Sequence, residues 1–267
     1  MSQILVELIK LANLIISLTK TLACANRISD VMDIKNSLEN GSAKEGIDGA
    51  PAVEFCSAAL RYKGSAEPAL SNVTFKAMRG ETIGIIGGTG SGKTSLVNLI
   101  PRFYDTDSGC VKVNGVNVRE YDIDSLRRKI GVVPQKAVLF KGTIASNLRW
   151  GSEDASERDM ESAVGTAQAS EVVNGKDNGY DAYVAQGGSN FSGGQRQRLT
   201  IARALVKDPE ILILDDSASA LDFATDANLR KAIRELPSNP TVFVVSQRTA
   251  SVMNADRIII CKTDFMI

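Results

Sequence analysis

The sequence has no histidine, few aromatic residues and no excess of either charge. Without an imidazole, the chain cannot use histidine as a general base or as a metal ligand, so both kinds of site are excluded. Its 31 basic and 31 acidic residues cancel, which argues against nucleic acid as a partner over a broad surface. A length of 267 residues, 43% of them hydrophobic, fits one large globular domain, alone or with an appendage.

Cysteine is scarce as well. The four cysteines, Cys24, Cys56, Cys110 and Cys261, are widely spaced and form no C-x-x-C motif. In a chain of this size, such spacing predicts buried free thiols in a reducing compartment rather than a disulfide framework.

No uninterrupted apolar run reaches the ~20 residues that span a bilayer. Near the N-terminus, however, apolar residues recur at alternating spacings of four and three, which predicts a helix with an apolar seam. Glu7 and Lys10 interrupt the seam, and no cleavage site indicates a secretory signal. Two interpretations stay open: an amphipathic helix packed on the domain, or the inner end of a transmembrane helix. The seam comprises Ile4, Leu8, Leu11, Ile15, Leu18 and Leu22.

Residues 35–51 are polar and rich in glycine and asparagine, which predicts a linker before a compact domain that begins at residue 52. Within the domain, continuous apolar strands favour a parallel sheet covered on both faces. These strands are predicted at Thr82–Ile86, Ile211–Leu214, Val242–Val245 and Ile258–Ile260.

Shorter segments around residues 53–75 and 111–118 predict additional strands. The second alternates and contains Asn114-Gly115, a strong hairpin signal, so these strands form an antiparallel β annex. From about residue 137 to 195 the pattern is mostly helical. The expected fold is therefore α/β, with a mostly parallel sheet, an antiparallel β annex and an inserted helical subdomain.

The strand Thr82–Ile86 leads into a complete G-x-x-x-x-G-K-[ST] motif, and a helical pattern follows it. This order suits a phosphate cradle, because glycine N–H groups close around phosphates and the helix N-terminus adds its dipole. Lys93 is expected to reach the β- and γ-phosphates, and the Thr94 hydroxyl to bind Mg²⁺. The alternative is a chance glycine-rich turn. The motif is Gly87, Gly88, Thr89, Gly90, Ser91, Gly92, Lys93 and Thr94, with Ser95 next in the helix.

The strand Ile211–Leu214 ends in Asp215, which is the Walker B pattern of a P-loop NTPase core. A carboxylate at that place holds Mg²⁺, directly or through water. The alternative is a core strand that happens to have an acidic end.

A second glycine-rich segment consists of Phe191, Ser192, Gly193, Gly194 and Gln195. It is not a second cradle, because no lysine follows the glycines. Its hydroxyl, its glycine N–H groups and the following helix start can bind an anion. Ser192 and Gln195 also have the spacing of a capping box, and one set of residues can serve both purposes.

In this order, the motifs resemble the nucleotide-binding domain of ABC transporters, over residues 52–261. The resemblance implies an ATPase of the ABC fold that uses ATP and Mg²⁺. It also implies that Tyr62 stacks on adenine and that Gln135 senses Mg²⁺ and the γ-phosphate while contacting the membrane domain. Asp222 resembles the D-loop aspartate at a dimer interface. The residues that carry the resemblance are Tyr62, Gly87–Thr94, Gln135, Phe191–Gln195, Ile211–Asp216 and Ser219–Asp222.

The family resemblance also implies partners and a location. Two such domains face head to tail, with each ATP between the P-loop of one and the signature Phe191–Gln195 of the other. Residues 1–34 then fit the end of the last transmembrane helix of an exporter, on the cytoplasmic face of the cell membrane. Residues 52–267 form the nucleotide-binding domain without its usual C-terminal segments, and residues 137–195 form its helical subdomain.

Two residues depart from the family pattern. Asp216 replaces the usual glutamate that polarises the attacking water, and Gln247 replaces the switch histidine. Losing one methylene withdraws a carboxylate by about 1.5 Å, and a misplacement of about 1 Å can cost on the order of 10²-fold in rate. Glutamine can donate a hydrogen bond but is never a cation. With Gln135, these residues form the candidate catalytic set.

Together the two departures resemble the degenerate-site subunit of heterodimeric ABC exporters. This predicts a hydrolytically weak site whose signature completes the competent site of a different subunit. Two alternatives remain: a soluble ABC ATPase of DNA repair or translation, and an ATP-binding regulatory module with negligible hydrolysis. The exporter-like N-terminal helix counts against the first, and single-turnover measurements separate the second.

Overall fold

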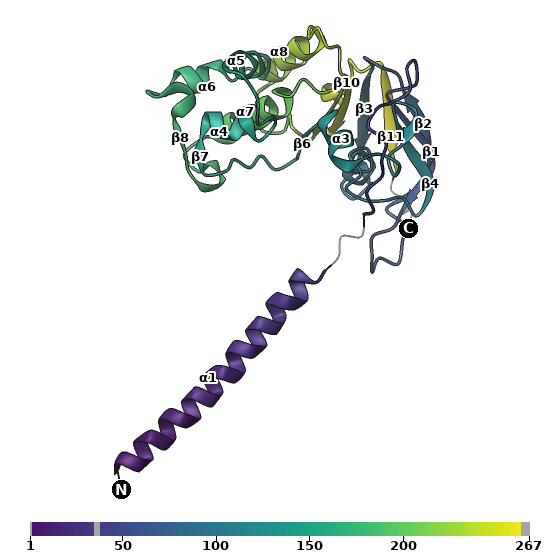
Figure 1. Cartoon of the computed structure of the whole chain (residues 1–267). Helices are drawn as coiled ribbons and strands as arrows, with labels where there is room; N and C mark the ends of the chain where they lie inside the picture. The colour runs from purple at the N-terminus through teal and green to yellow at the C-terminus, as the bar shows by residue number, and fades with distance from the viewer. Residues whose placement is uncertain (1, 35–37, 263–267) are drawn as a thin grey trace. The chain divides into compact units, whose positions relative to one another are not determined.

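The computed structural model describes residues 2–34 and 38–262, and its contacts divide the chain into two units, residues 1–39 and 40–267. The first unit contains one helix, α1 (Ser2–Met32), and the second contains the sheets and the remaining helices (Figure 1).

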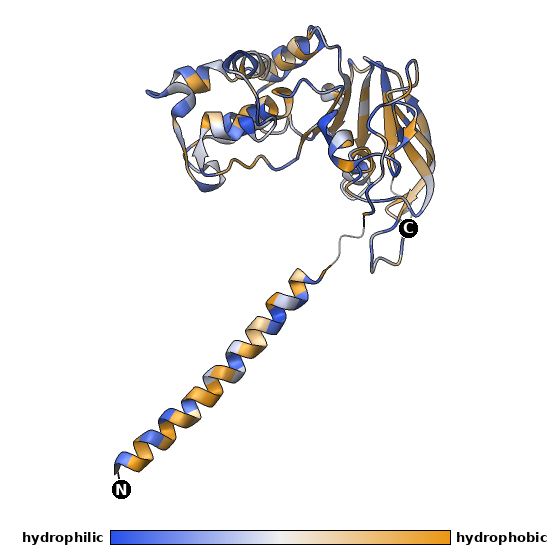
Figure 2. Cartoon of the chain, viewed as in Figure 1, coloured by the Kyte–Doolittle hydropathy of each residue, from blue (hydrophilic) through white to orange (hydrophobic). Residues whose placement is uncertain are grey.

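Helix α1 carries apolar residues along its length, orange in Figure 2. Their large side chains are exposed. By length and composition alone, its segment Gln3–Met32 could cross a membrane: its most apolar stretch has a mean hydropathy of 1.5, and no residue of that stretch is buried. Glu7 and Lys10 lie one turn apart and form an ion pair at 2.9 Å. The two charges that interrupt the apolar seam therefore neutralise each other.

A parallel five-stranded sheet forms the centre of the second unit, with the strand order β11-β3-β10-β9-β6. All residues of β9 and β10 are buried, which confirms the prediction from the continuous apolar runs. Parallel pairing brings the carboxyl ends of β3, β9 and β10 to one edge. The strands are β3 (Thr82–Gly87), β6 (Ile130–Val133), β9 (Ile211–Asp215), β10 (Thr241–Ser246) and β11 (Arg257–Cys261).

The predicted β annex is an antiparallel sheet of order β2-β1-β4-β5. Asn114 and Gly115 have φ angles of 47° and 80°, so the Asn-Gly pair forms the expected hairpin turn. The stacked rings of Phe55 and Phe75, 4.6 Å apart, belong to the core shared by the annex and the central sheet. The strands are β1 (Val53–Leu60), β2 (Leu70–Ala77), β4 (Ser108–Val113) and β5 (Val116–Asn117).

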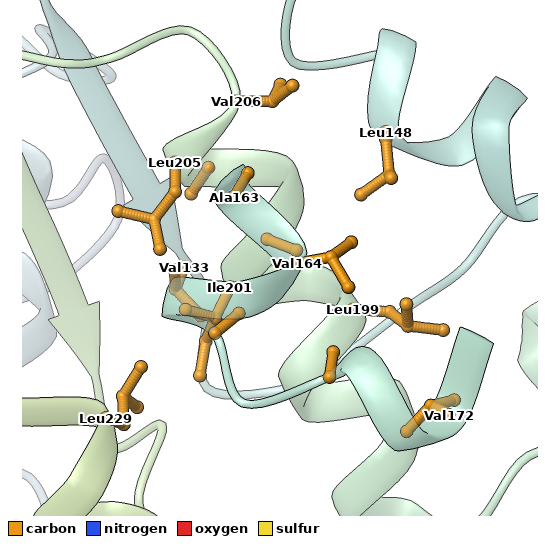
Figure 3. Close-up of a cluster of buried hydrophobic side chains, with 14 of the residues drawn as sticks. Val133, Leu148, Ala163, Val164, Val172, Leu199, Ile201, Leu205, Val206 and Leu229 are labelled. Carbon is orange, nitrogen blue, oxygen red and sulfur yellow. The ribbon is translucent and has the colours of Figure 1, made fainter. Parts of the chain in front are cut away.

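A second buried cluster joins the helical region to the other face of the sheet, and Figure 3 shows part of it. In that figure Val133 of β6 lies among Ile201 and Leu205 of α7 and Val164 of α5. The helices of this region are α4 (Ile144–Arg149), α5 (Glu157–Thr166), α6 (Ser170–Asn174), α7 (Gly193–Leu205) and α8 (Phe223–Arg234).

The remaining elements are short. A two-stranded sheet and two 3₁₀ turns lie between the helices, two six-residue helices follow β3 and β5, and a third 3₁₀ turn follows β10. They are α2 (Lys93–Asn98), α3 (Ile123–Arg128), β7 (Gly142–Thr143), β8 (Tyr183–Val184), η1 (Gly179–Asp181), η2 (Gln186–Gly188) and η3 (Thr249–Ser251).

Two details differ from the sequence-based expectations. Residues 40–51, predicted as part of a linker, are hydrogen-bonded to the domain: the Gly41 N–H donates to the Tyr121 carbonyl at 3.0 Å. A Cβ atom at Gly41 would lie 2.1 Å from the Glu120 carbonyl oxygen, so glycine here permits close packing rather than flexibility. Residues 35–37 of the predicted linker lie outside the described residues.

The prediction of buried cysteines is wrong, because Cys24 is exposed and the other three are half-buried.

Candidate functional site

The glycine-rich loop between β3 and α2 has the backbone of a cradle. Gly90 and Gly92 have φ angles of 80° and 82°, in the left-handed region that favours glycine. A Cβ atom at Gly92 would lie 2.6 Å from the Ala69 carbonyl oxygen, so a larger residue does not fit there. Around a Cβ atom built at Gly88, apart from the adjacent residues of the chain, no heavy atom of the described residues lies within 4 Å. The loop is therefore closed towards the protein at Gly92 and open at Gly88.

Lys93 is buried and folds back over this loop. Its Nζ donates hydrogen bonds to the carbonyl oxygens of Gly87 at 2.8 Å and Gly88 at 2.6 Å. The ammonium group is thus held at the place where the sequence predicts phosphate oxygens.

Thr94, Gln135 and Asp215 are the residues expected to act on Mg²⁺. Two of them, Thr94 and Asp215, meet directly although they are 121 positions apart in the chain, whereas Gln135 lines the same cleft without a hydrogen bond to either of these described residues. The Thr94 hydroxyl donates to the Asp215 carboxylate, at 3.0 Å from Oδ2 and 3.2 Å from Oδ1. Burial raises the pKa of Asp215; the Thr94 hydrogen bond opposes this rise, Asp216 adds to it and Lys93 opposes it. A buried carboxylate that its surroundings make costly to ionise favours a bound cation.

Hydroxyl and carboxylate oxygens are suitable Mg²⁺ ligands, and Mg²⁺ usually takes its remaining ligands from water and substrate phosphates. Among the described residues, no group of three or more His, Cys, Asp or Glu side chains is placed to hold a metal ion. The donor set of Thr94 and Asp215 therefore fits Mg²⁺ that arrives with a nucleotide, rather than a cage made of protein alone.

Asp216 lies immediately past β9, and its N–H donates to the Val245 carbonyl at 2.9 Å. Its φ angle of 47° is in the left-handed region, which aspartate tolerates better than most side chains. The Gln135 Nε2 lies 3.5 Å from the Asp216 Oδ2, at the outer limit of a hydrogen bond. Sequence reasoning missed this backbone conformation, and the only signal for it was an aspartate directly after a buried strand.

A cleft of about 110 Å³ brings most of the predicted site together. It includes Gln247, which follows β10 and is exposed to solvent. The residues that line it are Thr89, Gly90, Lys93, Thr94, Gln135, Asp215, Asp216, Val245 and Gln247. Candidate residues from four separate segments therefore face one small space, at the carboxyl edge of the parallel sheet.

Tyr62 lies beside the cradle rather than in the cleft. Its hydroxyl donates to the Ser95 Oγ at 2.9 Å, and its ring meets the ring of Tyr104 edge-on at 5.0 Å. The ring also packs partly against the core shared with the annex. In this structure Tyr62 is a packing residue next to α2, and its role towards adenine stays a prediction.

The second glycine-rich segment forms the start of α7. Ser192 and Gln195 make a reciprocal capping box: the Gln195 N–H donates to Ser192 Oγ at 3.2 Å, and the Ser192 N–H to Gln195 Oε1 at 3.0 Å. Phe191 is buried, whereas Ser192 and Gly193 are exposed. Among the described residues, no heavy atom lies within 4 Å of a Cβ built at Gly193. Of the described signature residues, none lines the cleft around Lys93.

Asp222 is the N-cap of α8. Its carboxylate accepts hydrogen bonds from the Thr225 N–H at 2.9 Å and from the Thr225 hydroxyl at 2.7 Å. These hydrogen bonds lower the pKa of Asp222. Helix capping accounts for an aspartate at this position, and a role at a dimer interface stays a prediction.

Comparisons with known proteins identify a family that this chain resembles in sequence and fold. A family model described as "ABC transporter" matches residues 70–219. The uncharacterized ABC transporter ATP-binding protein YfiB of Bacillus subtilis (strain 168) is 41% identical over 95% of this chain and 44% of its own length. An ATP-dependent lipid A-core flippase of Desulfotalea psychrophila is 38% identical over 90% of this chain and 42% of its own length.

Among solved structures, a bacterial Atm1-family ABC exporter with ATP bound matches with a TM-score of 0.83 and 27% identity. The match covers 92% of this chain and 44% of the exporter chain, so this chain spans less than half the length of the relatives named here. The fold is that of an ABC ATPase. Because the family model covers more than half of the residues, the chain belongs to the ABC transporter family.

Proposed function

We propose that this chain is the nucleotide-binding domain of an ABC exporter, which binds ATP with Mg²⁺ and powers export by pairing with a second such domain. The observation that carries the proposal is the single cleft shared by Lys93, Thr94, Asp215, Asp216 and Gln247. The cradle backbone and the likeness to an exporter with ATP bound support it.

In this proposal the main polar residues of the cleft, and Tyr62 beside it, have defined tasks. Lys93 exchanges its two carbonyl partners for phosphate oxygens, and the glycine N–H groups bind the same phosphates. Thr94 and Asp215 hold Mg²⁺, which neutralises charge on the phosphates when it is bound. Gln135, beside Asp216, positions the attacking water, and Tyr62 supports the adenine ring.

We further propose that the chain's own site hydrolyses ATP slowly. The Asp216 carboxylate is one methylene shorter than glutamate, and its backbone is fixed by the hydrogen bond to Val245. Gln247 can donate a hydrogen bond to a γ-phosphate, but it cannot relay a proton or carry a positive charge. ATP binding therefore stays strong while the general base lies too far from its water.

The signature is assigned to the ATP of a partner domain. Ser192 and Gly193 are exposed, and the described residues leave the space at Gly193 open. The segment also does not line the chain's own cleft. A helix start with free glycine N–H groups offers the donors that a second nucleotide's phosphates require. Because the own site is weak, we propose that the partner is a different subunit.

The transmembrane domain of the same transporter is the other proposed partner. Besides α1, an exposed aromatic surface supports this assignment: the rings of Phe140 and Trp150 lie 4.7 Å apart at a tilt of 32°, and Trp150 is 68% exposed. Trp150 and Pro134 line one cavity of about 240 Å³, and Pro134 immediately precedes Gln135. A partner bound there would reach the ATP cleft through two adjacent residues. In this proposal the domain lies on the cytoplasmic face of the membrane, where ATP is available.

The test is steady-state ATPase activity of the chain alone and of its mixture with a second ABC subunit that has glutamate and histidine at the corresponding positions. We expect ATP binding and slow turnover alone, and fast turnover in the mixture. Asp216→Glu should raise the turnover of the chain alone, by up to roughly 10²-fold if reach is the defect. Lys93→Ala, the control, should abolish ATP binding.

Fast turnover by the unmodified chain alone would contradict the weak-site proposal. Failure to bind ATP would contradict the function itself. If single-turnover experiments detect no hydrolysis even in the mixture, the chain is a regulatory ATP-binding module. A soluble ABC ATPase is disfavoured, because it gives no reason for the exposed apolar side chains of α1.

A further inference from the structure

Two cysteines far apart in the sequence face each other in the annex sheet. Strands β1 and β4 pair antiparallel, and Cys56 is the direct register partner of Cys110. Both are free thiols and both are half-buried. We propose that Cys56 and Cys110 form a redox-sensitive pair that closes to an intramolecular disulfide when the protein meets a small-molecule disulfide, and reopens on reduction.

The backbone spacing suits such a bond. The Asn114 N–H donates to the Ala52 carbonyl at 3.0 Å, so these two residues form a hydrogen-bonded cross-strand pair. Hydrogen-bonded and non-hydrogen-bonded pairs alternate along an antiparallel ladder, so Cys56 and Cys110 also occupy a hydrogen-bonded pair. In such pairs the Cα atoms lie about 5.5 Å apart, close to the commonest Cα separation in disulfides.

The side chains lie on the same, outer face of the annex. Burial alternates along both strands, with Glu54 and Cys56 half-buried on β1 and Cys110 and Lys112 half-buried on β4. Glu54 forms an ion pair with Lys112 at 3.7 Å, which shows that facing side chains meet across this face. The next pair on this face of the ladder is the two thiols, and small reagents reach both because neither is fully buried.

Closing the bond requires the two side chains to move closer together. Cβ atoms of facing residues lie about 4.5–5.5 Å apart in a sheet, towards the upper value in hydrogen-bonded pairs, and about 3.5–4.5 Å apart in a disulfide. The ladder is irregular directly beyond Cys56, with a register shift before Ala59 and φ angles of 50° at Ser57 and 69° at Gly109. Regular strand pairing therefore holds the two cysteines only on the side towards Phe55 and Val111, so the other side can adjust when the sulfur atoms approach.

The chemistry balances as two exchange steps. One thiolate of the pair attacks a sulfur of oxidised glutathione, which releases one glutathione thiolate and leaves a mixed disulfide. The second thiolate attacks the protein sulfur of that mixed disulfide, forms the Cys56–Cys110 bond and releases the second glutathione. The protein loses two electrons and two protons, and one glutathione disulfide is reduced to two thiols. Burial raises the pKa of Cys56, with smaller contributions from Cys110 and Glu54 that Lys112 opposes, so exchange is slow at neutral pH.

The chain enclosed by this bond contains Tyr62 and the whole cradle Gly87–Thr94. Cross-linking across a long enclosed segment lowers the entropy of the unfolded chain. The oxidised protein should therefore melt at a higher temperature than the reduced protein, by roughly 5 °C or more.

The test treats the full chain with oxidised glutathione, blocks remaining thiols with an alkylating reagent and maps the peptides by mass. We expect a Cys56–Cys110 cross-link that has lost the mass of two hydrogen atoms, and a rise in Tm that dithiothreitol reverses. The double variant Cys24→Ser, Cys261→Ser should still close. Cys56→Ser and Cys110→Ser should each take up glutathione instead, without the rise in Tm.

The proposal is overturned if Cys56 and Cys110 are recovered as alkylated thiols under conditions that modify Cys24. It is equally overturned if each carries its own glutathione, or if either is linked to Cys24, to Cys261 or to a second molecule. Because the mapping uses the unmodified chain, this result does not depend on the folding of any variant.

Discussion

At the scale of a single residue, the buried carboxyl group of Asp215 lowers the stability of the folded chain although the proposed function requires it. Because burial raises its pKa, the folded protein disfavours the ionised form. Without nucleotide, stability falls as the pH rises from the ordinary carboxyl pKa through the raised pKa of Asp215, since the unfolded chain then ionises more readily. The carboxylate is thus a stability cost that the proposed Mg²⁺ ion would relieve.

Asp215→Asn should therefore raise the Tm of the nucleotide-free chain at neutral pH, by on the order of 2–4 °C for each kcal/mol of relieved cost. The gain should vanish in acid, where the wild-type carboxyl is protonated. Mg²⁺-dependent ATP binding should be lost. Thermal unfolding across a pH series, with ATP titration, measures both effects. Asp222→Asn is the matched control, since asparagine caps a helix as well as aspartate. A lower Tm for Asp215→Asn at neutral pH would contradict this reasoning.

Much of the cleft could be predicted residue by residue. Lys93 and Thr94 follow β3, and Asp215 ends β9, so parallel pairing brings them to one edge of the sheet. The left-handed backbone of Asp216 and the pairing of Cys56 with Cys110 could not be predicted. Both depend on strand register and local twist, which the order of residues along one segment does not specify.

At the scale of elements, the start of α7 combines a structural and a proposed functional role in Ser192. Helix α5 has the same reciprocal capping box without a glycine pair: the Asp159 N–H donates to Ser156 Oγ at 3.2 Å. The two helices therefore offer a matched comparison between capping alone and capping combined with a signature.

Ser192→Ala and Ser156→Ala should each destabilise the chain by about 1 kcal/mol through loss of a cap. Neither should weaken ATP binding by the chain alone, because neither serine lines its cleft. Only Ser192→Ala should reduce the ATPase activity of the mixed pair. Thermal unfolding and ATPase assays on the same samples separate the two effects. An equal loss of mixed-pair activity in both variants would assign Ser192 a capping role only.

Long buried strands were the elements best predicted, because β9 and β10 are apolar at nearly every position and lie between two layers. The four-residue strand β6 is too short to show a hydrophobic period of its own, so it was not predicted as a strand. In residues 40–51, Gly41 and Gly46 allow close backbone contact and the Asn40 side chain hydrogen-bonds to residues 122 and 123, uses that composition cannot distinguish from flexibility.

At the scale of the whole molecule, the chain combines one exposed apolar helix with a domain that has its own two-part core. The full chain should therefore bind phospholipid vesicles, whereas residues 40–267 alone should stay in solution and keep their affinity for ATP. Vesicle co-sedimentation and ATP titration measure the two properties.

The matched control is the full chain with Leu11→Lys and Ile15→Lys. A lysine in the centre of a membrane helix costs roughly 2.5–3.5 kcal/mol, so this variant should lose most of its vesicle binding. Equal binding by the full chain and by residues 40–267 would show that α1 is not the membrane contact.

The two carbonyl contacts of Lys93 affect which anions the cradle can bind. Two of the three N–H donors of its ammonium already have carbonyl partners, at 2.8 Å and 2.6 Å, so an arriving anion can add one short bond and must replace the others. A lone chloride gains little from that exchange. A polyphosphate presents several oxygens at once, so it can replace both carbonyls while the glycine N–H groups bind the rest. If the chain binds ATP as proposed, the nucleotide-free loop should therefore bind a phosphate chain in preference to a single small anion.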